Sequence, residues 1–172
     1  RVLFRSSQAI QTEDNQGLDQ GSPAPLVVVS GPSGVGKTTV VSSTRTLCPR
    51  AWLSISATTR RARPGEVDGV DYLFLDEETF AEKVRAGAFL EWAVFAGNSY
   101  GSPKKPIEEM RASGTPVILE IEVQGARQVR KAAPDATLVF IAPPSKDALR
   151  DRLTSRGTET ETELNSRLDV AE

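Results

Sequence analysis

The chain has 172 residues, 38% of them apolar, and its 21 basic and 23 acidic residues leave a net charge of −2. This length fits one globular domain, and the near-neutral charge argues against bulk binding of nucleic acid. The chain contains no histidine and one cysteine, Cys48, so it lacks histidine general bases, imidazole metal ligands, an internal disulfide framework and a cysteine zinc cage.

Residues 1–25 are polar, carry no helical or strand periodicity and end in Gly-Ser-Pro-Ala-Pro. We interpret them as a disordered tail or as an artefact of expression or read-through. The N-terminus lacks the apolar core of a signal peptide, and no apolar run reaches the length that a membrane span requires. The sequence therefore predicts a cytoplasmic protein with no membrane partner.

A glycine-rich loop follows the apolar run 26–29 after one serine. Its sequence matches the G-x-x-x-x-G-K-[ST] phosphate loop, and it stands between a predicted strand and a predicted helix, where that motif binds a nucleoside triphosphate. The backbone N–H groups would form an anion-binding nest, Lys37 would reach the β- and γ-phosphates, and the Thr38 hydroxyl would ligate Mg²⁺. The residues predicted to bind ATP are Gly31, Pro32, Ser33, Gly34, Val35, Gly36, Lys37, Thr38 and Thr39.

Four apolar runs predict the strands of the domain. Three have the pattern of interior parallel strands, and they are residues 26–29, 117–121 and 137–142. The fourth, residues 52–56, alternates and is expected nearer an edge. Ser56, Glu120 and Glu122 fall at or next to strand ends, and ligands of parallel sheets bind beyond the carboxyl ends of the strands.

Helices are predicted between these strands. The apolar spacing that marks the first two helices is Val40, Thr44 and Leu47, followed by Ala126, Val129 and Ala133. Ser145 is placed to cap a third helix after two prolines. Cys48, late in the first helix, is expected to be a buried small hydrophobic residue. Strands that alternate with helices predict an α/β domain with a parallel-sheet core.

Residues 57–104 interrupt this alternation and predict a small antiparallel subdomain. Residues 70–75 alternate like a half-buried strand, and Asp76 is placed to cap a helix. Residues 89–95 and 99–102, with Gly97-Asn98 between them, predict a β-hairpin. Such an insertion is large enough to bind a second substrate.

Arg60, Arg61 and Arg63 precede a Pro-Gly-Glu turn in this insertion, and Tyr72 and Tyr100 follow later. Arginine binds phosphate through two parallel N–H groups, and tyrosine hydroxyls donate to the same oxygens. A solvated basic turn is the alternative interpretation. The phosphate loop and the separate subdomain favour a second phosphate site, which gives the donor and acceptor sites that a phosphoryl-transfer enzyme needs.

From Leu26 to Glu172 the chain resembles guanylate kinase, the P-loop kinase that transfers the γ-phosphoryl group of ATP to GMP. The Arg-Pro-Gly-Glu and Glu-Trp-Ala sequences are more specific signals than the phosphate loop, which many unrelated NTPases share. The segments that carry the resemblance are GPSGVGKTTV, SISATTRRARPGEVDGVDY, FLEWAVFAGNSYGS, ILEIEVQGA, FIAPPS and RLTSRGTETE.

The resemblance implies two groups of GMP-binding residues. The phosphate would be held by Arg60, Arg63, Tyr72 and Tyr100, with Glu66 bracing the arginines, and the base would be read by Ser56, Glu91 and Ser102. The chemistry of Glu91 follows from the base itself, since guanine presents N1–H and its 2-amino group side by side to one carboxylate. Adenine presents an N1 acceptor there, which a negative oxygen repels. Without the resemblance, an ordinary exposed strand residue would be the alternative.

The resemblance also implies a Mg²⁺-dependent catalytic site. Glu120 and Glu122 occupy positions where relatives carry aspartates that contact the Mg²⁺ water shell and the acceptor guanosine, although two outward-facing acids would also fit the pattern. The side chains that would stabilise the transferring phosphoryl group are Lys37, Arg60 and the lid arginines Arg152, Arg156 and Arg167.

The implied domain organisation is a core of about residues 26–56 and 115–144, a GMP-binding subdomain of about 57–104 and a lid of about 145–167. The resemblance further implies segments beyond Glu172, so we expect the C-terminus to be truncated. The implied partners are ATP and GMP, and the sequence indicates no oligomeric state.

Two other functions fit parts of the pattern. A non-catalytic guanylate-kinase-like domain would bind phosphopeptides through the same arginines, but such domains typically have a degraded phosphate loop, whereas Gly36-Lys37-Thr38 is intact. A kinase for another nucleoside monophosphate is opposed by Glu91 and Ser102. ATP-binding calorimetry separates the first alternative, and a panel of acceptor nucleotides separates the second.

Overall fold

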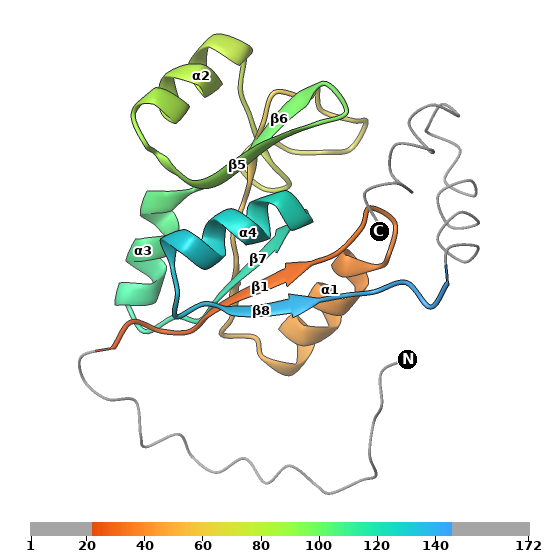
Figure 1. The fold of residues 1–172 in the computed structure, drawn as a ribbon, viewed down its shortest axis with the longest axis vertical. Helices are drawn as coiled ribbons and strands as arrows, with labels where there is room; N and C mark the ends of the chain where they lie inside the picture. The colour runs from red at the N-terminus through yellow and green to blue at the C-terminus, as the bar shows by residue number, and fades with distance from the viewer. Residues whose placement is uncertain (1–21, 146–172) are drawn as a thin grey trace, which may run out of the picture.

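The computed structural model describes residues 22–145, and its main sheet is parallel (Figure 1). The strands are β1 (Leu26–Ser30), β2 (Trp52–Leu53), β7 (Val117–Ile121) and β8 (Thr137–Phe140). Their order is β2-β7-β1-β8, and each neighbouring pair is parallel. The predicted parallel sheet is confirmed, and the carboxyl ends of β1 and its neighbours lie together at one edge.

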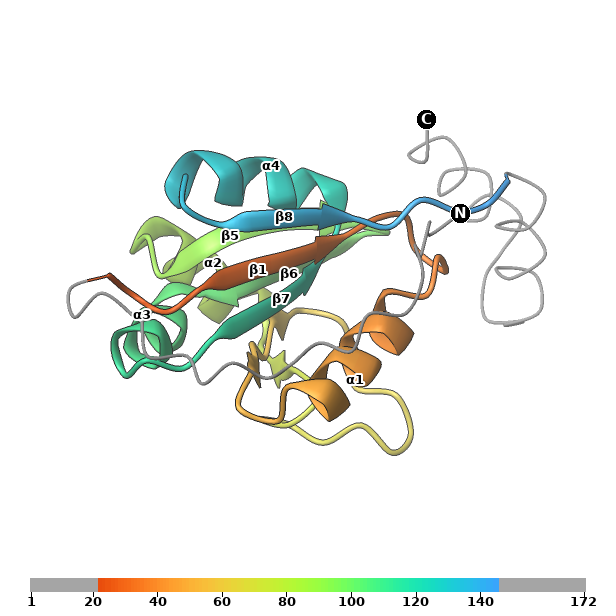
Figure 2. The ribbon, with the colours of Figure 1, turned by 90° about the horizontal axis from the view of Figure 1, so that it is seen from below.

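Helices cover both faces of this sheet (Figure 2). One face carries α1 (Lys37–Leu47), and the other carries α4 (Val123–Ala132). The helix α3 (Lys104–Ala112), which precedes β7, packs into the core on the α4 side through Ile107. The side chains of a strand alternate between the two faces. Leu26 and Val28 therefore join the cluster that contains Ile107 and Val129, whereas Val29 joins the α1 side. A strand buried on both faces explains the continuous apolar run of β1.

The inserted residues form a second sheet in the order β4-β3-β6-β5. Its strands are β3 (Ala57–Thr58), β4 (Leu73–Phe74), β5 (Phe89–Phe95) and β6 (Asn98–Pro103). The pairs β3–β6 and β5–β6 are antiparallel as predicted, but β3 and β4 are parallel, so the sheet is mixed. A long loop between β3 and β4 brings the chain back in its original direction, which a hairpin could not do.

The β5–β6 hairpin turns at Ala96 and Gly97, one residue before the predicted turn. Both have a positive φ, 49° and 75°, which is the backbone of a type I′ turn. The predicted strand 70–75 shrinks to Leu73–Phe74, because the Asp71 carboxylate and backbone hold Val67 in a turn instead.

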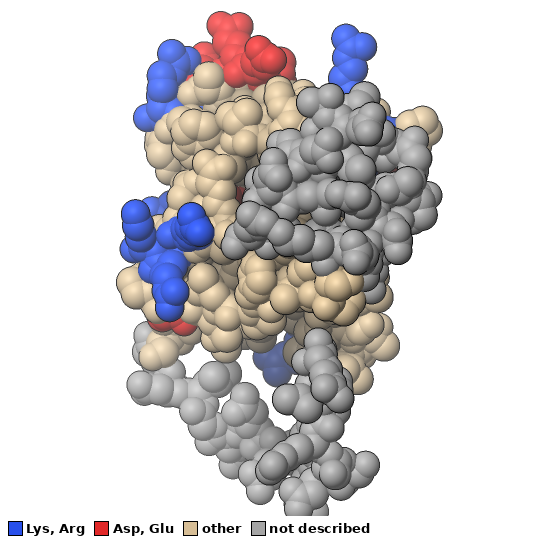
Figure 3. All heavy atoms as spheres, turned by 45° about the vertical axis from the view of Figure 1, so that its right-hand side comes forward, with Lys and Arg blue, Asp and Glu red and all other residues tan. Residues whose placement is uncertain are grey.

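The helix α2 (Glu77–Arg85) begins as predicted. The Asp76 side chain accepts a hydrogen bond from the backbone N–H of Thr79 at 2.7 Å and caps the helix. Phe80 is buried and stacks on Phe89, with ring centroids 4.6 Å apart, so α2 packs on the hairpin. Acidic side chains, red in Figure 3, gather at the top of the molecule over the end that carries α2.

Three expectations about packing were wrong, and one helix was missed. The strand β8 is the last strand of the sheet within residues 22–145 and its four residues are exposed, so it is not interior there. In α1 the buried apolar residue is Val41, whereas Val40 and Leu47 are exposed. Cys48 is exposed rather than buried. The helix α3 was not predicted at all.

Candidate active site

The phosphate loop joins β1 to α1 at the carboxyl edge of the main sheet (Figure 1). Gly36 is the N-cap of α1 and has a φ of 102°, a left-handed conformation that favours glycine. A Cβ at Gly31 would lie 2.4 Å from the carbonyl oxygen of Ile141, so the loop packs closely against the chain after β8. The loop therefore ends at a helix N-terminus, which favours anions.

Lys37 folds back over this loop. Its side-chain nitrogen donates to the carbonyl oxygens of Gly31 at 2.7 Å and Pro32 at 3.2 Å, and forms an ion pair with the Glu122 carboxylate at 2.8 Å. Only 8% of Lys37 is exposed. A lysine this buried must be paired, and Glu122, the N-cap of α4, supplies the charge.

Thr38 and Glu120 meet beside the loop. The register pairs Val29 of β1 with Glu120 of β7. The Glu120 carboxylate therefore lies beside the end of β1, the strand that leads into the phosphate loop. The Thr38 hydroxyl donates to Glu120 Oε1 at 2.7 Å. Hydroxyl and carboxylate oxygens are the hard ligands that Mg²⁺ takes, so these two residues fit a magnesium ion held beside bound phosphates.

The Arg60 guanidinium forms a two-pronged ion pair with Glu66. Its two terminal nitrogens donate to the two Glu66 oxygens at 3.0 and 2.9 Å, and the backbone N–H of Arg63 donates to Glu66 Oε2 at 2.7 Å. The hydrogen bond from Arg60 lowers the pKa of the Glu66 carboxyl and raises that of Arg60. Glu66 therefore stays ionised and fixes the direction of the guanidinium.

Two rings flank the same guanidinium. The central carbon of Arg60 lies 5.3 Å from the ring centroid of Tyr72 and 5.9 Å from that of Phe74. Tyr100 meets Tyr72 edge to face, with centroids 6.3 Å apart. Burial raises the pKa of Tyr72, so its hydroxyl stays a neutral hydrogen-bond donor at neutral pH. Three of the four side chains expected to hold the GMP phosphate thus lie together.

Glu91 is a buried carboxylate on β5. The hairpin register places it opposite Ser102 of β6, whose hydroxyl donates to Glu91 Oε1 at 2.7 Å. Glu91 is 4% exposed, and burial raises its pKa, against the opposing effect of the hydrogen bonds from Ser102. Glu91 has no cationic partner within residues 22–145, and a buried carboxylate left unpaired is costly, which indicates a role other than stability.

We expect Glu91→Gln to stabilise the fold at neutral pH. Burial raises the folded-state pKa of Glu91 above its ordinary value of 4.5. The protonated form therefore contributes stability that is fully present below pH 4.5 and is lost as the pH rises through the raised pKa. Glutamine keeps the acceptor for Ser102 without the charge. Thermal melts should show a gain of roughly 2–5 °C at about pH 7 that disappears near pH 4.

The matched control is Glu82→Gln on the exposed side of α2, which should show no such pH-dependent gain. A Glu91→Gln variant that melts lower than the parent chain at pH 7 contradicts the assigned cost of burial.

The remaining predicted site residues lie outside these side-chain clusters or outside the described residues. Arg63 is exposed and contacts Glu66 through its backbone, and half-buried Ser56 accepts a backbone hydrogen bond from Leu73 through its carbonyl oxygen. Thr39 is exposed on α1. The predicted lid 145–167 lies outside the described residues except for Ser145, and so do its arginines, Arg152, Arg156 and Arg167. The expected truncation of the C-terminus also falls outside them.

Sequence reasoning missed residues that contact the site residues or the backbone beside them. Thr58 is fully buried, and its hydroxyl accepts from the backbone N–H of Arg60 at 3.1 Å. Gln128 of α4 bonds to the backbone of Trp92, next to Glu91, and Gly125 stands against Glu91 itself. The one available signal was a glycine inside a helical pattern, which usually has a packing or functional reason.

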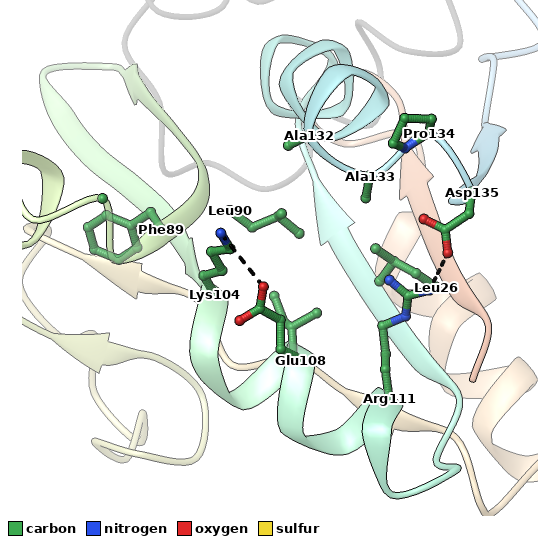
Figure 4. Close-up of a pocket in the computed structure, with 12 residues that line it drawn as sticks. Leu26, Phe89, Leu90, Lys104, Glu108, Arg111, Ala132, Ala133, Pro134 and Asp135 are labelled. Atoms are coloured by element: carbon green, nitrogen blue, oxygen red, sulfur yellow. Dashed lines mark hydrogen bonds and ion pairs between the residues drawn. The ribbon is translucent and has the colours of Figure 1, made fainter. Parts of the chain in front are cut away.

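A separate hollow lies at the opposite end of β1 (Figure 4). It is lined by Leu26 at the start of β1 and by parts of α3, α4 and β5. Its rim carries the ion pairs Lys104–Glu108 and Arg111–Asp135. None of the predicted site residues lines this hollow. The candidate active site is therefore the edge of the sheet that holds the phosphate loop, together with the facing side of the inserted sheet.

Within residues 22–145, no helix has the length and apolar character needed to cross a membrane.

Known proteins resemble this chain over most of its length. A family model described as guanylate kinase matches residues 24–172. Guanylate kinases of Frankia casuarinae and Thermobifida fusca are 56% and 54% identical to it, over 87% and 92% of this chain and 81% and 80% of theirs. The crystal structure of guanylate kinase from Anaplasma phagocytophilum superimposes with a TM-score of 0.65 at 33% identity, over 85% of this chain and 73% of that one.

Proposed function

Since the chain belongs to the guanylate kinase family, we propose that the edge holding Lys37 binds ATP and that the inserted sheet binds GMP. The enzyme is an ATP:GMP phosphotransferase, and the products are ADP and GDP. The observation that carries the acceptor assignment is the burial of the Glu91 carboxylate beside Ser102. In this proposal the carboxylate accepts hydrogen bonds from N1–H and the 2-amino group of guanine.

The phosphate of GMP is proposed to bind at Arg60. The guanidinium is oriented by Glu66 and by the rings of Tyr72 and Phe74, so little rotamer freedom is lost when phosphate arrives. Arg63, Tyr72 and Tyr100 complete this group in the proposal. The Glu66 charge keeps the region from being uniformly positive, and Nη1 of Arg60 is held further by donating to the Arg61 carbonyl oxygen at 2.6 Å.

On the ATP side, Lys37 is proposed to exchange its loop carbonyl partners for the β- and γ-phosphates. Thr38 and Glu120 are proposed to hold Mg²⁺, directly and through water, and the ion supplies charge neutralisation to the phosphate oxygens. Glu122 pairs with Lys37 and keeps its charge compensated in the absence of nucleotide.

No strong general base is needed, because the acceptor is a phosphate oxygen that is already anionic. Catalysis therefore rests on holding the two substrates in line and on neutralising the transferring group. The proposed lid arginines Arg152, Arg156 and Arg167 lie outside the described residues, and their part in this neutralisation is carried by the resemblance alone.

A coupled assay of ADP release tests the proposal, with GMP, AMP, CMP and UMP as acceptors at fixed ATP and Mg²⁺. The expected result is turnover with GMP at a kcat/KM far above that of the other three. Preference for another nucleotide refutes the assignment of Glu91. Binding of ATP without turnover of any acceptor favours the non-catalytic phosphopeptide-binding alternative.

We expect Arg60→Lys to weaken GMP binding more than ATP binding. Lysine keeps the charge but cannot form the two parallel hydrogen bonds to Glu66, nor grip two phosphate oxygens at once. Steady-state kinetics should show a rise in the KM for GMP of about tenfold or more, with the KM for ATP nearly unchanged. Arg127→Lys, on the exposed face of α4, is the control and should change neither constant. Equal losses for both substrates would indicate a general electrostatic or folding effect.

A further inference from the structure

Gly125 lies in the helix α4, where its backbone conformation does not require glycine. It is buried, and its φ is not in the left-handed region that other glycines of this chain occupy. Glycine inside a helix destabilises it relative to alanine, because it loses more backbone freedom on folding. The reason for a glycine at this position is therefore the space around it.

The carboxylate of Glu91 occupies that space. A Cβ built on Gly125 would lie 2.2 Å from Glu91 Oε2 and 2.9 Å from its carboxyl carbon. The Cδ1 atom of Ile121 would lie 3.3 Å away on another side. Non-bonded carbon atoms pack at about 3.5–4.0 Å, so no side chain fits at position 125 while the Glu91 carboxylate stays in place.

Both oxygens of Glu91 are thus located by a neighbour. Oε1 accepts the hydroxyl of Ser102 at 2.7 Å, and Oε2 stands against the bare backbone of Gly125. Ser102 is fully buried and Glu91 nearly so. The orientation of the carboxylate plane follows from these two contacts together.

The helix cannot move away to make room. Gln128, three residues after Gly125 on the same face of α4, donates from its amide nitrogen to the Trp92 carbonyl at 2.6 Å. Its amide oxygen accepts from the Trp92 backbone N–H at 3.3 Å. Trp92 follows Glu91 in β5, and Val129 of α4 is buried in the core. Helix and strand are therefore held together, and the movable part is the end of the Glu91 side chain.

From these contacts we infer that Gly125 is a positioning residue for recognition of the guanine base, because its missing side chain sets where the Glu91 carboxylate stands. The inference rests on the proposed binding of GMP by Glu91. Gly125 contacts no substrate in this arrangement and acts through Glu91. A methyl group at position 125 displaces the carboxylate, which then no longer stands where it can accept hydrogen bonds from N1–H and the 2-amino group of guanine. The phosphate loop is left unchanged.

The test is Gly125→Ala in the full chain. The KM for GMP should rise about 10- to 100-fold, since a displacement of about 1 Å costs that much, and the GMP-to-AMP ratio of kcat/KM should fall. The KM for ATP should stay nearly unchanged. The melting temperature should hold or rise by roughly 2–5 °C, because alanine favours the helix and the clash is relieved by a flexible side-chain end. The control is Gln124→Ala, exposed in the same turn, which should leave the KM for GMP unchanged.

A double variant keeps the test decisive. With Glu91→Ala the carboxylate is absent, so adding Gly125→Ala should produce no further change in the KM for GMP and should raise the melting temperature. If Gly125→Ala raises the KM for GMP equally in the parent chain and in Glu91→Ala, the inference is overturned, because the effect then does not act through Glu91. If Gly125→Ala does not fold, the double variant should fold, and its failure to do so also overturns the inference.

The companion variant Glu91→Gln separates the inference from the proposed function. If Gly125→Ala leaves GMP kinetics unchanged while Glu91→Gln impairs them, the positioning role fails and the function of Glu91 stands. If neither variant affects GMP kinetics, base reading by Glu91 fails and the positioning role fails with it.

Discussion

Replacing Lys37 by alanine should reduce kcat by about 10³-fold or more while the protein remains folded. The ammonium group lies in the phosphate loop, and its partners are two loop carbonyls and Glu122 rather than the apolar core. Its loss removes the charge that we propose neutralises the transferring phosphoryl group. The Glu122 side chain is 32% exposed, so water solvates its carboxylate once the lysine is gone and the fold is retained. The measurements are ADP release with saturating GMP and a thermal melt.

The matched control is Lys105→Ala. Lys105 is an exposed lysine on α3, with one weak helical ion pair to Glu109 at 3.7 Å. Its removal takes away the same charge without touching the site, so turnover should stay normal. Near-normal turnover by Lys37→Ala would refute the assignment of the phosphate loop to ATP. A Lys37→Ala variant that fails to melt cooperatively would show that the lysine holds the loop together as well.

The phosphate loop and the capped helix α2 could be predicted because their signals are local. The loop motif fixes residue types within eight positions, and Asp76 caps α2 through a contact three residues away. The resemblance named Glu91 and Ser102 separately as base-reading residues, and the register of the β5–β6 hairpin is what places them opposite each other. In each case the partners are close in the sequence or are joined by a single tight turn.

Residues whose role depends on long-range packing could not be predicted. Gly125 and Gln128 matter because α4 returns alongside β5 after more than twenty-five intervening residues, and no local pattern encodes that approach. The helix α3 was missed because Pro106 stands in its first turn and its buried apolar residue is Ile107 alone. Proline is tolerated there, since the first-turn N–H groups have no intrahelical partner.

Faces and edges were the other source of error. In α1 the apolar spacing of Val40 and Leu47 pointed to the wrong face, because the helix is mostly polar and Val41 alone packs in the core. The strand β8 is as apolar as an interior strand, yet its neighbour among the described strands is β1 only. An apolar run reports how hydrophobic a strand is and not where it stands in the sheet.

The helix α4 contacts both halves of the proposed active site. Glu122 at its N-cap pairs with Lys37 of the phosphate loop, Gly125 lies against Glu91, and Gln128 holds the backbone next to Glu91. These three residues are spaced three apart, so they share one side of the helix. The relative placement of the ATP and GMP sites is therefore set in large part by one rigid element.

The variant Glu91→Gln should lose discrimination between guanine and adenine. The glutamine oxygen still accepts from N1–H, but its amide N–H₂ now faces the 2-amino group of guanine, donor against donor. The GMP-to-AMP ratio of kcat/KM should fall by about 100-fold, since buried polar groups left unmatched cost 1–3 kcal/mol each. IMP lacks the 2-amino group and escapes the new repulsion, so it should lose much less activity than GMP.

The comparison of GMP, AMP and IMP makes this result specific to the base. All three carry the same phosphate, so damage to the Arg60 region lowers their kcat/KM together and leaves the ratios unchanged. A loss confined to GMP, with the fold as stable as the parent or more so at pH 7, is the expected combination, because the buried charge that we propose reads guanine also costs stability. An unchanged GMP-to-AMP ratio means that Glu91 does not read the base, and the specificity would then have to come from other residues around Ser102.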